Sequence, residues 1–436
     1  MYKIGIDLAQ ISRMEQCLQN PRFMTRVFSK AEQDFFAAKG GEASSAAANF
    51  AAKEAFSKAL GTGIRGFSLN EVSVLRHDNG EPYLLLEGKA IEIAQERGLT
   101  FSVSLTNEGG MACAVVAAHR ETAGLQPVAR ERLDRLQKKF GADLKRASLL
   151  DVSFVSSVFP KRDPLSHKGS YGKLTILAGC NCYRGAAALC TGAALRSGAG
   201  IVTLASVPSV IDAVSAKLYE PVYLPLPQNE EGTLSSLAVP LLLEQAKTAS
   251  ALLIGCGLGR SEDVAAAVIA LLENAVCPVV LDADGLNAIA NRIDILRTAK
   301  CRIIVTPHLG EMSRLCGKSI AALQDDPAGA AKTFAETYGV TVVLKDADTI
   351  VASTDGSLFL NTTGNAGMAR GGSGDVLAGI IAAFVCQGLS PEHAAACGVY
   401  LHGAAGDLAA AGGSMLGMLP SDMIDVLPRL YHFAEE

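Results

Sequence analysis

Residues Asn361–Phe384, NTTGNAGMARGGSGDVLAGIIAAF, decide how the second part of this chain folds. A glycine-rich loop in this stretch runs directly into apolar residues at helical spacing, from Val376 to Phe384. Glycines let backbone N–H groups converge on one point, and the first turn of a helix leaves further N–H groups without partners. The junction therefore predicts a site that holds a phosphate or a developing oxyanion.

Asp375 is the acidic residue at this junction. An aspartate there either caps the helix that follows or acts as a general base on a group held by the amides, and the sequence leaves both roles open. The stretch contains no GxxxxGK[ST] pattern, so an ordinary nucleotide-binding P-loop is not expected.

Length and composition indicate a large folded protein. The 436 residues predict two or three domains, and 49% hydrophobic with 19% charged residues exclude a disordered chain. A net charge of -5 gives no general attraction to nucleic acid or to anionic membranes, and no apolar run is long enough to span a bilayer. The eleven cysteines are scattered without a CxxC pair, which is typical of reduced thiols. We expect a soluble cytoplasmic protein that binds neither nucleic acid nor membrane.

Residues 1–119 behave as one unit of mixed helices and strands. An alternating strand that carries Asp7 precedes a helical pattern, and a later alanine-rich helix carries Lys53 and Glu54. The simplest interpretation of Lys53 and Glu54 is that they lie on the exposed face of that helix.

Four motifs in this unit resemble holo-acyl-carrier-protein synthases. They are IGIDLAQISRM, the R-x-F-S-x-x-E pattern of Arg26 to Glu32, NFAAKEAFSKALGTGI and VSLTNEGGMACAVV. The resemblance implies an α+β phosphopantetheinyl-transferase domain that moves the 4'-phosphopantetheine arm of coenzyme A to a serine of acyl carrier protein, a step of fatty acid biosynthesis. It also implies that Asp7 and Glu54 hold Mg²⁺, with Glu54 catalytic, and oxygen ligands of this kind suit that ion.

The same resemblance assigns the basic residues of the unit to its partners. Lys53, Lys58 and Arg65 would meet the phosphates of coenzyme A, and the basic residues near the first helix would face an acidic carrier protein. Those residues are Arg13, Arg22 and Arg26. Because members of the family are trimers with sites between subunits, we expect a homo-oligomer, either a trimer or a larger assembly.

Asn107 departs from the family pattern, which usually has a histidine there. Asparagine cannot exchange a proton near neutral pH, so any acid–base role of that position is lost. We expect the transferase activity to be retained because both metal ligands are present. The alternative is a non-catalytic oligomerisation or carrier-protein-docking module.

Residues 120–150 are rich in arginine and lysine, with Leu133, Leu136 and Phe140 on one helical stripe. We interpret this segment as a charged helical linker rather than a nucleic-acid-binding element.

From residue 151 to 436, short apolar strands alternate with alanine-rich helices, which predicts an α/β fold with a parallel sheet covered on both faces. Ligands bind such sheets at the carboxyl ends of the strands. The candidates at those ends are Gly255–Gly259, Asp282–Asn287, His308–Glu311 and Lys345–Thr349. We expect them to share one rim with the glycine-rich loop. The structural alternatives are a tight turn at GCGLG, helix capping by the two aspartates of LDADG, and a loop histidine with satisfied hydrogen bonds.

Seven motifs between residues 150 and 432 resemble the ADP-dependent NAD(P)HX dehydratases of the ribokinase-like superfamily. They are HKGSYGKLTILAG, YRGAAALCTGAALRSGAGIVTLAS, GCGLG, LDADGLN, TPHLGEMSRL, the K-x-x-x-T of residues 345–349, and NTTGNAGMARGGSGDVLAGIIAA. The resemblance implies a ribokinase-like α/β/α domain with a mostly parallel central sheet. It also implies repair of hydrated NADH or NADPH: ADP or ATP phosphorylates the ring hydroxyl, and loss of phosphate regenerates the reduced dinucleotide. With ADP the products are AMP and phosphate.

Site residues follow from this resemblance position by position. Those that would contact the hydrated dinucleotide are Ala186, Gly257, His308 and Asp375, with Asp375 as the base toward its hydroxyl. Those that would contact the adenine nucleotide are Lys345, Asp346, Ala347, Asp348, Thr349 and Gly374.

Two positions depart from the dehydratase pattern: Asp346 stands where glycine is usual, and Cys256 replaces proline in the GPG turn. Asp346 adds negative charge beside the expected nucleotide site. The alternative function is a ribokinase-like kinase that phosphorylates another small alcohol and releases a stable product.

Overall fold

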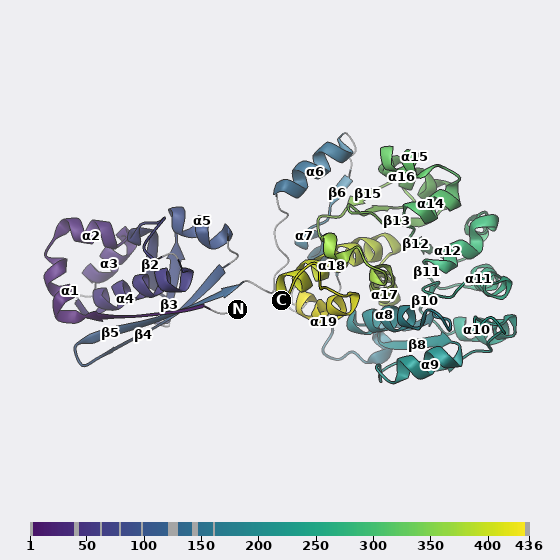
Figure 1. Cartoon of the computed structure of the whole chain (residues 1–436), viewed down its shortest axis with the longest axis horizontal. Coiled ribbons are helices and arrows are strands. Elements are labelled where there is room, and N and C mark those ends of the chain that lie inside the picture. Colours follow the sequence, from purple (N-terminus) through teal and green to yellow (C-terminus); the bar gives the residue numbers. More distant parts are fainter. Residues whose placement is uncertain are drawn as a thin grey trace. The chain divides into compact units, whose positions relative to one another are not determined.

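The computed structural model (Figure 1) describes residues 3–38, 43–61, 63–77, 80–96, 99–120, 130–141, 147–159 and 162–431. The chain forms two compact units, Met1–Thr122 and Ala123–Glu436, called here the N-terminal and C-terminal units. Among the helices described, none is both long and apolar enough to cross a membrane.

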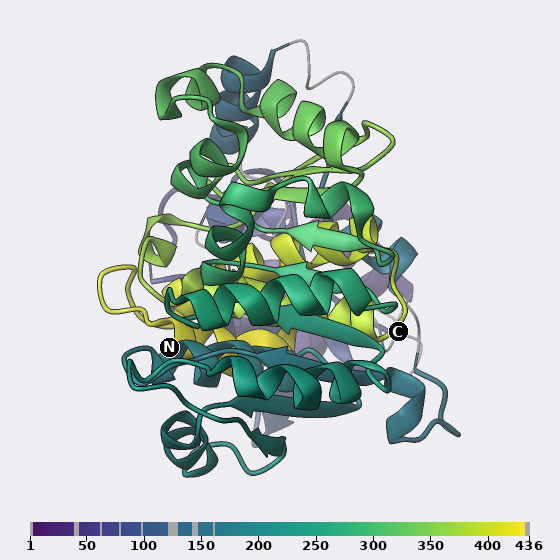
Figure 2. The same cartoon turned by 90° about the vertical axis from the view of Figure 1, so that its right-hand side faces the viewer.

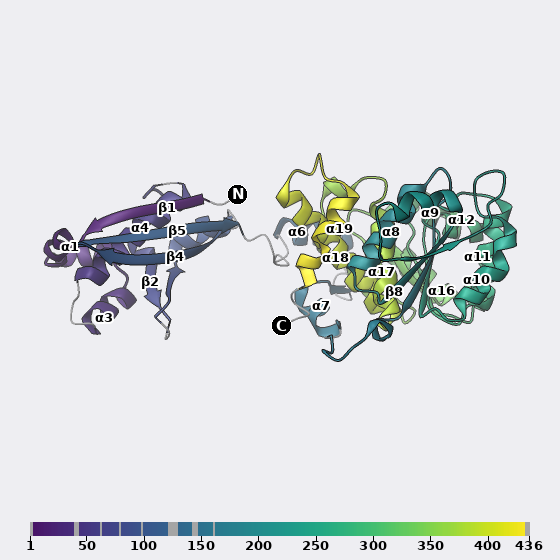
Figure 3. The ribbon, with the colours of Figure 1, turned by 90° about the horizontal axis from the view of Figure 1, so that it is seen from below.

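The N-terminal unit is built on an antiparallel three-stranded sheet of order β1-β5-β4, whose strands lie side by side in Figure 3. The strands are β1 (Lys3–Gln10), β5 (Met111–Arg120) and β4 (Leu99–Glu108). Helix α4 (Ala43–Leu60) packs on one face of this sheet, and its alanines allow a close approach. A Cβ atom at Gly5 would collide with the backbone oxygen of Ala55, so glycine is required there.

The other face of this sheet is exposed, and it is apolar on β1 and β5. Ile4, Ile6 and Leu8 are 68%, 56% and 60% exposed, and they pair across the strands with Ala117, Val115 and Cys113. The remaining elements of the unit are α1 (Ile11–Leu18), α2 (Pro21–Val27), α3 (Lys30–Ala38), η1 (Leu69–Glu71), the antiparallel pair β2 (Val72–Arg76) and β3 (Pro82–Leu86), and α5 (Gly88–Glu96).

The C-terminal unit contains a ten-stranded sheet. Its order is β6 (Ala147–Leu149), β15 (Leu358–Leu360), β14 (Ile350–Ala352), β13 (Thr341–Leu344), β12 (Ile303–Val305), β11 (Val279–Leu281), β10 (Ala251–Ile254), β7 (Lys173–Leu177), β8 (Ile201–Ser206) and β9 (Val222–Pro225). Neighbours run parallel except around β14, which is antiparallel to both β13 and β15. Residues Lys345–Thr349 therefore form the turn of the β13–β14 hairpin.

Helices cover both faces of this sheet (Figure 2). One layer contains α7 (Val152–Val158), α8 (Arg184–Arg196), α9 (Pro208–Ser215), α17 (Ser373–Cys386), α18 (Pro391–Gly412) and α19 (Pro420–Leu430). The other contains α6 (Arg130–Phe140), α10 (Val239–Ala246), α11 (Glu262–Asn274), α12 (Asp284–Ile289), α13 (Ile295–Thr298), α14 (Leu309–Cys316), α15 (Ile320–Asp325) and α16 (Pro327–Tyr338). Short 3₁₀ turns are η3 (Lys168–Tyr171), η4 (Ser236–Ala238), η5 (Ala290–Arg292) and η6 (Ala366–Met368).

Helix α17 is the central helix of this unit. Nearly all of its side chains are buried, from Val376 to Cys386, because it lies between the sheet and its neighbours α8 and α18. The predicted α/β class and the mostly parallel sheet are confirmed. Of the expected linker 120–150, α6 and β6 belong to the C-terminal unit, while residues 121–129 and 142–146 lie outside the described part.

Candidate active site

A cavity of about 810 Å³ opens where the carboxyl ends of β11, β12 and β13 meet the start of α17. Seven of the residues that the dehydratase resemblance assigned to the substrates line it: His308, Lys345, Asp346, Ala347, Thr349, Gly374 and Asp375. The strand ends and the glycine-rich loop thus share one rim. A cavity of this size suits a nucleotide or another ligand of similar dimensions.

Asp375 lies in the first turn of α17 but does not cap it. The N-cap is Gly372, in the left-handed conformation at φ 101°, and no side chain caps the helix. The carboxyl group is partly buried beside Asp282, and desolvation together with the charge of Asp282 raises its pKa to about 7. Asp375 is therefore poised to exchange a proton near neutral pH.

Asp282 is the second acid of the site and is almost fully buried. Its Oδ1 accepts hydrogen bonds from Lys345 Nζ at 2.6 Å and from Thr306 Oγ1 at 2.6 Å. Burial would lower the pKa of Lys345, but the charges of Asp282 and Glu311 outweigh it and raise that pKa. Lys345 is thus a fixed cation, 4.0 Å from Glu311 Oε2.

Cys256, which replaces the usual proline of the GCGLG turn, lies beside both acids. Its Sγ is 3.6 Å from Asp282 Oδ2, and its hydrogen bond to Asp375 opposes the rise in the pKa of that carboxyl group. The ligand atoms of Cys256, Asp282 and Asp375 lie within 4.8 Å of one another. Because the Lys345 ammonium group already occupies Asp282 Oδ1, this cluster fits proton and charge handling better than a metal site.

The backbone between Asp282 and Asp284 is strained. Ala283 has φ 47°, and among the described residues it alone combines a side chain with a positive φ. A Cβ atom at Gly255 would collide with the backbone oxygen of Asp282. The structure tolerates this strain where two loops meet at the site, as functional regions often do.

His308 combines a structural role with a position on the cavity. Its Nδ1 accepts the backbone N–H groups of Gly310 and Glu311, at 3.0 and 3.3 Å, so it caps α14. Glu311 in turn accepts the His308 N–H at 2.9 Å, which completes a capping box. The expected loop histidine with satisfied hydrogen bonds is found, and its half-exposed side chain also lines the cavity.

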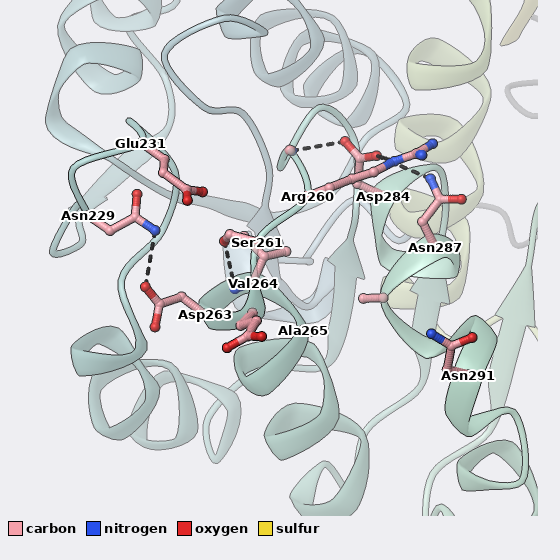
Figure 4. A pocket seen from close by; sticks show the side chains of 13 residues that line it. Asn229, Glu231, Arg260, Ser261, Asp263, Val264, Ala265, Asp284, Asn287 and Asn291 are labelled. Carbon is pink, nitrogen blue, oxygen red and sulfur yellow. Dashed lines mark hydrogen bonds and ion pairs between the residues drawn. The ribbon is translucent and has the colours of Figure 1, made fainter.

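Asp284 organises the GCGLG turn (Figure 4). Its carboxylate accepts the Gly259 N–H at 2.9 Å and the Asn287 amide at 3.2 Å, and it lies 3.5 Å from Arg260 Nε. The capping role considered for Asp282 and Asp284 is wrong, because the N-cap of α12 is Ala283 and no side chain caps it. Asp284 borders a separate pocket of about 700 Å³ at the start of α11.

Ala186 and Gly257 lie against each other rather than in the 810 Å³ cavity. A Cβ atom at Gly257 would be 2.7 Å from Ala186 Cβ. Because Gly257 directly follows Cys256, it lies next to the cluster of Cys256, Asp282 and Asp375, and Ala186 approaches it from α8.

Asp346 and Asp348 both form ion pairs with α6. Lys139 Nζ lies 3.0 Å from Asp346 Oδ2 and 3.4 Å from Asp348 Oδ2, and Arg135 Nη2 lies 2.7 Å from Asp348 Oδ1. Asp348 is buried and does not line the cavity, so its carboxylate stabilises the hairpin turn.

The N-terminal unit brings Asp7 and Glu54 together. Asp7 on β1 accepts a hydrogen bond from Lys58 Nζ at 2.7 Å, one helical turn beyond Glu54 on α4. Burial and the charge of Asp7 raise the pKa of Glu54. Two adjacent carboxylates of this kind fit a Mg²⁺ ion that is also bound by phosphate oxygens, once the half-exposed Lys58 releases Asp7 Oδ1.

The exposed position expected for Lys53, and its contact with coenzyme A phosphates, are wrong. Lys53 is fully buried, 2.6 Å from Glu32 Oε2, and donates to the carbonyl oxygens of Leu69 and Val72. Glu32 also accepts the Asn49 amide at 2.9 Å. Lys53 of the KEAF motif and Glu32 of the R-x-F-S-x-x-E motif therefore belong to a buried structural network. Of the other basic residues assigned to partners, Arg13, Arg22, Arg26, Lys58 and Arg65 are exposed.

Sequence reasoning gave no role at this site to Arg132, Arg135 and His402, which line the cavity. Arg132 and Arg135 are separated by three positions on α6, a helical spacing that would have placed them on one face. His402 is buried, and its Nε2 lacks a hydrogen-bond partner among the described residues. Burial lowers the pKa of His402 to about 4, so its imidazole is neutral at physiological pH.

The C-terminal unit has the architecture of the ribokinase-like class. It matches a ribokinase-like superfamily protein from Enterococcus faecalis with a TM-score of 0.58 and 26% identity, over 67% of this chain and 98% of that one. A family model described as NAD(P)H-hydrate dehydratase matches residues 174–429, and the chain belongs to this family. A model of the 4'-phosphopantetheinyl transferase superfamily matches residues 3–116, so both resemblances seen in the sequence are confirmed.

Similar proteins carry related names. The chain is 38% identical over 277 residues to the ADP-dependent (S)-NAD(P)H-hydrate dehydratase of Bacillus subtilis, which covers 64% of this chain and 95% of that protein. A crystal structure of the ADP/ATP-dependent NAD(P)H-hydrate dehydratase from the same organism, co-crystallized with ATP/Mg²⁺, matches with a TM-score of 0.57 and 34% identity, over 66% of this chain and 99% of that one.

The bifunctional NAD(P)H-hydrate repair enzyme Nnr of Moorella thermoacetica is 41% identical over 288 residues, or 66% of this chain and 54% of that protein. The chain thus spans about half the length of such bifunctional relatives.

Proposed function

We propose that the C-terminal unit dehydrates hydrated NADH and NADPH, with ADP or ATP as the phosphoryl donor. The observation that carries this proposal is Asp375, whose pKa is raised to about 7 where the glycine-rich loop meets α17. A base with a pKa near the working pH accepts a proton from an alcohol efficiently.

The proposed reaction has two steps. The ring hydroxyl gives its proton to Asp375 while its oxygen attacks the terminal phosphoryl group, and the bond to the nucleotide leaving group breaks, which releases AMP when the donor is ADP. The carbon–oxygen bond then breaks, phosphate leaves, and loss of a proton from the neighbouring ring carbon restores the double bond of the reduced nicotinamide. The amides before α17 and the Lys345 cation stabilise negative charge on the transferring group.

We assign the nucleotide to Lys345, Asp346, Ala347, Asp348, Thr349 and Gly374, and the dinucleotide to Ala186, Gly257, His308 and Asp375. The 810 Å³ cavity supports the first set, because five of its six residues line it. Asp348 contributes by holding the turn. Mg²⁺ would accompany the nucleotide phosphates and neutralise part of their charge.

The test is a turnover assay with purified hydrated NADH, comparing ADP with ATP. The expected result is recovery of NADH absorbance together with AMP and phosphate from ADP. Accumulation of a stable phosphorylated alcohol without recovery of NADH would instead identify a small-molecule kinase.

For the N-terminal unit we propose transfer of 4'-phosphopantetheine from coenzyme A to a serine of acyl carrier protein. Asp7 and Glu54 would hold Mg²⁺, and Glu54 would act at the reacting hydroxyl. Their adjacency and the raised pKa of Glu54 support this assignment. When bound, Mg²⁺ would screen the pyrophosphate of coenzyme A. The exposed Arg13, Arg22 and Arg26 would receive the acidic carrier protein.

The exposed apolar face of β1 supports a homo-oligomer. Three large side chains more than half exposed on one sheet face are typical of an interface. We propose that this face joins N-terminal units of different chains, as in the trimers expected from the sequence.

Mass spectrometry of apo acyl carrier protein, incubated with this chain, coenzyme A and Mg²⁺, tests the transferase. A gain of one phosphopantetheine group supports it, and an unchanged mass leaves the N-terminal unit as a docking or oligomerisation module.

We retain the functional division into a synthase-like domain 1–119, a charged linker 120–150 and a dehydratase domain 151–436, and a cytoplasmic location. The eleven cysteines are all free, which fits a reducing compartment.

A further inference from the structure

Helix α6 (Arg130–Phe140) lies between the residues matched by the two family models, 3–116 and 174–429. Neither resemblance assigns it a role. Nevertheless, two of its side chains, Arg132 and Arg135, line the cavity assigned to the adenine nucleotide. Among the described residues lining that cavity, the other arginine or lysine side chains are Lys345 and Arg370.

The helix is docked firmly on the C-terminal unit. Leu136 and Phe140 are buried in the hydrophobic core on one face of the sheet. The polar face of the helix carries Arg132, Arg135 and Lys139, which are spaced three and four residues apart. That face is directed at the two loops that border the cavity.

Arg132 holds the start of the glycine-rich loop. Its Nη1 donates to Gly364 O at 2.7 Å and its Nη2 to Thr363 O at 2.6 Å. Its Nε is buried and lacks a hydrogen-bond partner among the described residues. Both of these bonds go to neutral carbonyl oxygens, so no carboxylate is bound directly by this side chain, although the nearby charges of Asp407 and Asp348 act on it.

The charges around the nucleotide segment require such cations. Asp346 and Asp348 add two negative charges next to a site that would take a polyphosphate, and Asp282 already pairs with the Lys345 ammonium group at 2.6 Å. Lys139 pairs with Asp346 and with Asp348, and Arg135 binds Asp348 Oδ1 through Nε and Nη2 while also lining the cavity. Without them, the segment would repel an anionic ligand.

We propose that α6 completes the nucleotide site, with Arg132 and Arg135 attracting the phosphates of the adenine nucleotide and Lys139 neutralising Asp346. This inference rests on the proposed nucleotide-dependent function of the cavity. Asp346, which stands where the dehydratase family usually has glycine, is thus paired with a cation of α6, a helix that neither family model covers.

The test measures the Kd of the full chain for ADP with Mg²⁺ by calorimetry. The variants are Arg135→Gln, Lys139→Gln and Lys139→Gln combined with Asp346→Asn, and Lys138→Gln is the matched control because Lys138 is exposed on the same helix. Loss of one cation near a partly screened phosphate weakens binding about tenfold for Arg135→Gln and about threefold for Lys139→Gln. The double variant binds within about twofold of wild type, because the carboxylate nearest to Lys139 is then neutral and Arg135 still pairs with Asp348.

Salt provides a second readout that a purely structural role would not move. Raising the ionic strength weakens ADP binding by wild type more than by Arg135→Gln, since the variant has lost part of the charge that salt screens. The inference is overturned if Arg135→Gln binds ADP as tightly as wild type. It is also overturned if the double variant binds ADP no more tightly than Lys139→Gln alone. If Arg135→Gln does not fold, the comparison of Lys139→Gln with its double variant still decides.

The same titrations separate this inference from the proposed function. A chain that binds ADP with the expected dependence on α6 but does not repair hydrated NADH supports the inference and overturns the reaction. A wild-type chain that binds neither ADP nor ATP overturns both.

Discussion

Replacing Asp375 by asparagine tests whether the raised pKa of this carboxyl group belongs to a catalytic base. The variant keeps the shape of the side chain but cannot accept a proton. Loss of a general base typically lowers turnover about 100- to 10,000-fold, so we expect a decrease of this size in kcat for repair of hydrated NADH. In the wild-type enzyme, kcat/KM should rise with pH and level off above about pH 7, because the ionised carboxylate is the active form.

The same substitution should stabilise the fold at high pH. The pKa of Asp375 rises from an ordinary value of 3.8 to about 7 in the folded chain. This difference in pKa corresponds to about 4 kcal/mol. Below about pH 4 the group is protonated in both the folded and unfolded states, so the stabilisation is absent; it develops between about pH 4 and pH 7 and is complete above.

Urea unfolding of wild type and Asp375→Asn at about pH 4.5 and pH 8 measures this difference. The matched control is Asp325→Asn, an exposed residue of α15 whose replacement should change stability little at either pH. If Asp375→Asn stabilised the fold equally at the two pH values, burial would not be raising the pKa of the Asp375 carboxyl group. Undiminished turnover by Asp375→Asn would refute its role as the base.

Three further predictions concern the N-terminal unit. Lys53→Met should destabilise this unit by about 3–5 kcal/mol in chemical unfolding, because it leaves Glu32 buried without its cation; a loss below about 1 kcal/mol would contradict the buried ion pair. Glu54→Gln should abolish the Mg²⁺-dependent mass gain of acyl carrier protein, whereas the exposed control Glu92→Gln should not. Ile6→Lys should dissociate the expected oligomer in sedimentation velocity, and an unchanged sedimentation coefficient would exclude the β1 face as the interface.

The fold of the C-terminal unit was predictable because its signals are local. Runs of apolar β-branched residues, helical spacing after the glycine-rich loop and the order of strands and helices gave the parallel sheet and the rim of candidate residues. The sequence did not indicate that β14 runs antiparallel to β13, unlike the parallel strands of the sheet. TVVLKDADTIVAS is apolar on both sides of Lys345–Thr349, and a strand buried on both faces has the same composition in either direction.

The partners of charged residues were less predictable than their positions. Lys53 lies within an alanine-rich helix, where an exposed cation is the ordinary expectation, but Glu32 and two carbonyl oxygens satisfy it in the interior. Arg132 and Arg135 were interpreted as part of a linker, because residues more than 200 positions away complete their contacts. Such pairings depend on tertiary structure, which a local pattern does not record.

The two buried acids of the site acquire different roles from their neighbours. Asp282 accepts hydrogen bonds from the Lys345 ammonium group and from the Thr306 hydroxyl group. Burial and the charge of Asp282 raise the pKa of Asp375, and the hydrogen bond with Cys256 and the charge of Lys345 lower it by less. One carboxylate thus holds the cation that faces the phosphoryl group, while the other stays near half ionisation at neutral pH and can take the proton. If Lys345 bound Asp375 instead, the two acids would exchange roles. The ion pair between Lys345 and Asp282, at 2.6 Å, keeps the lysine on Asp282.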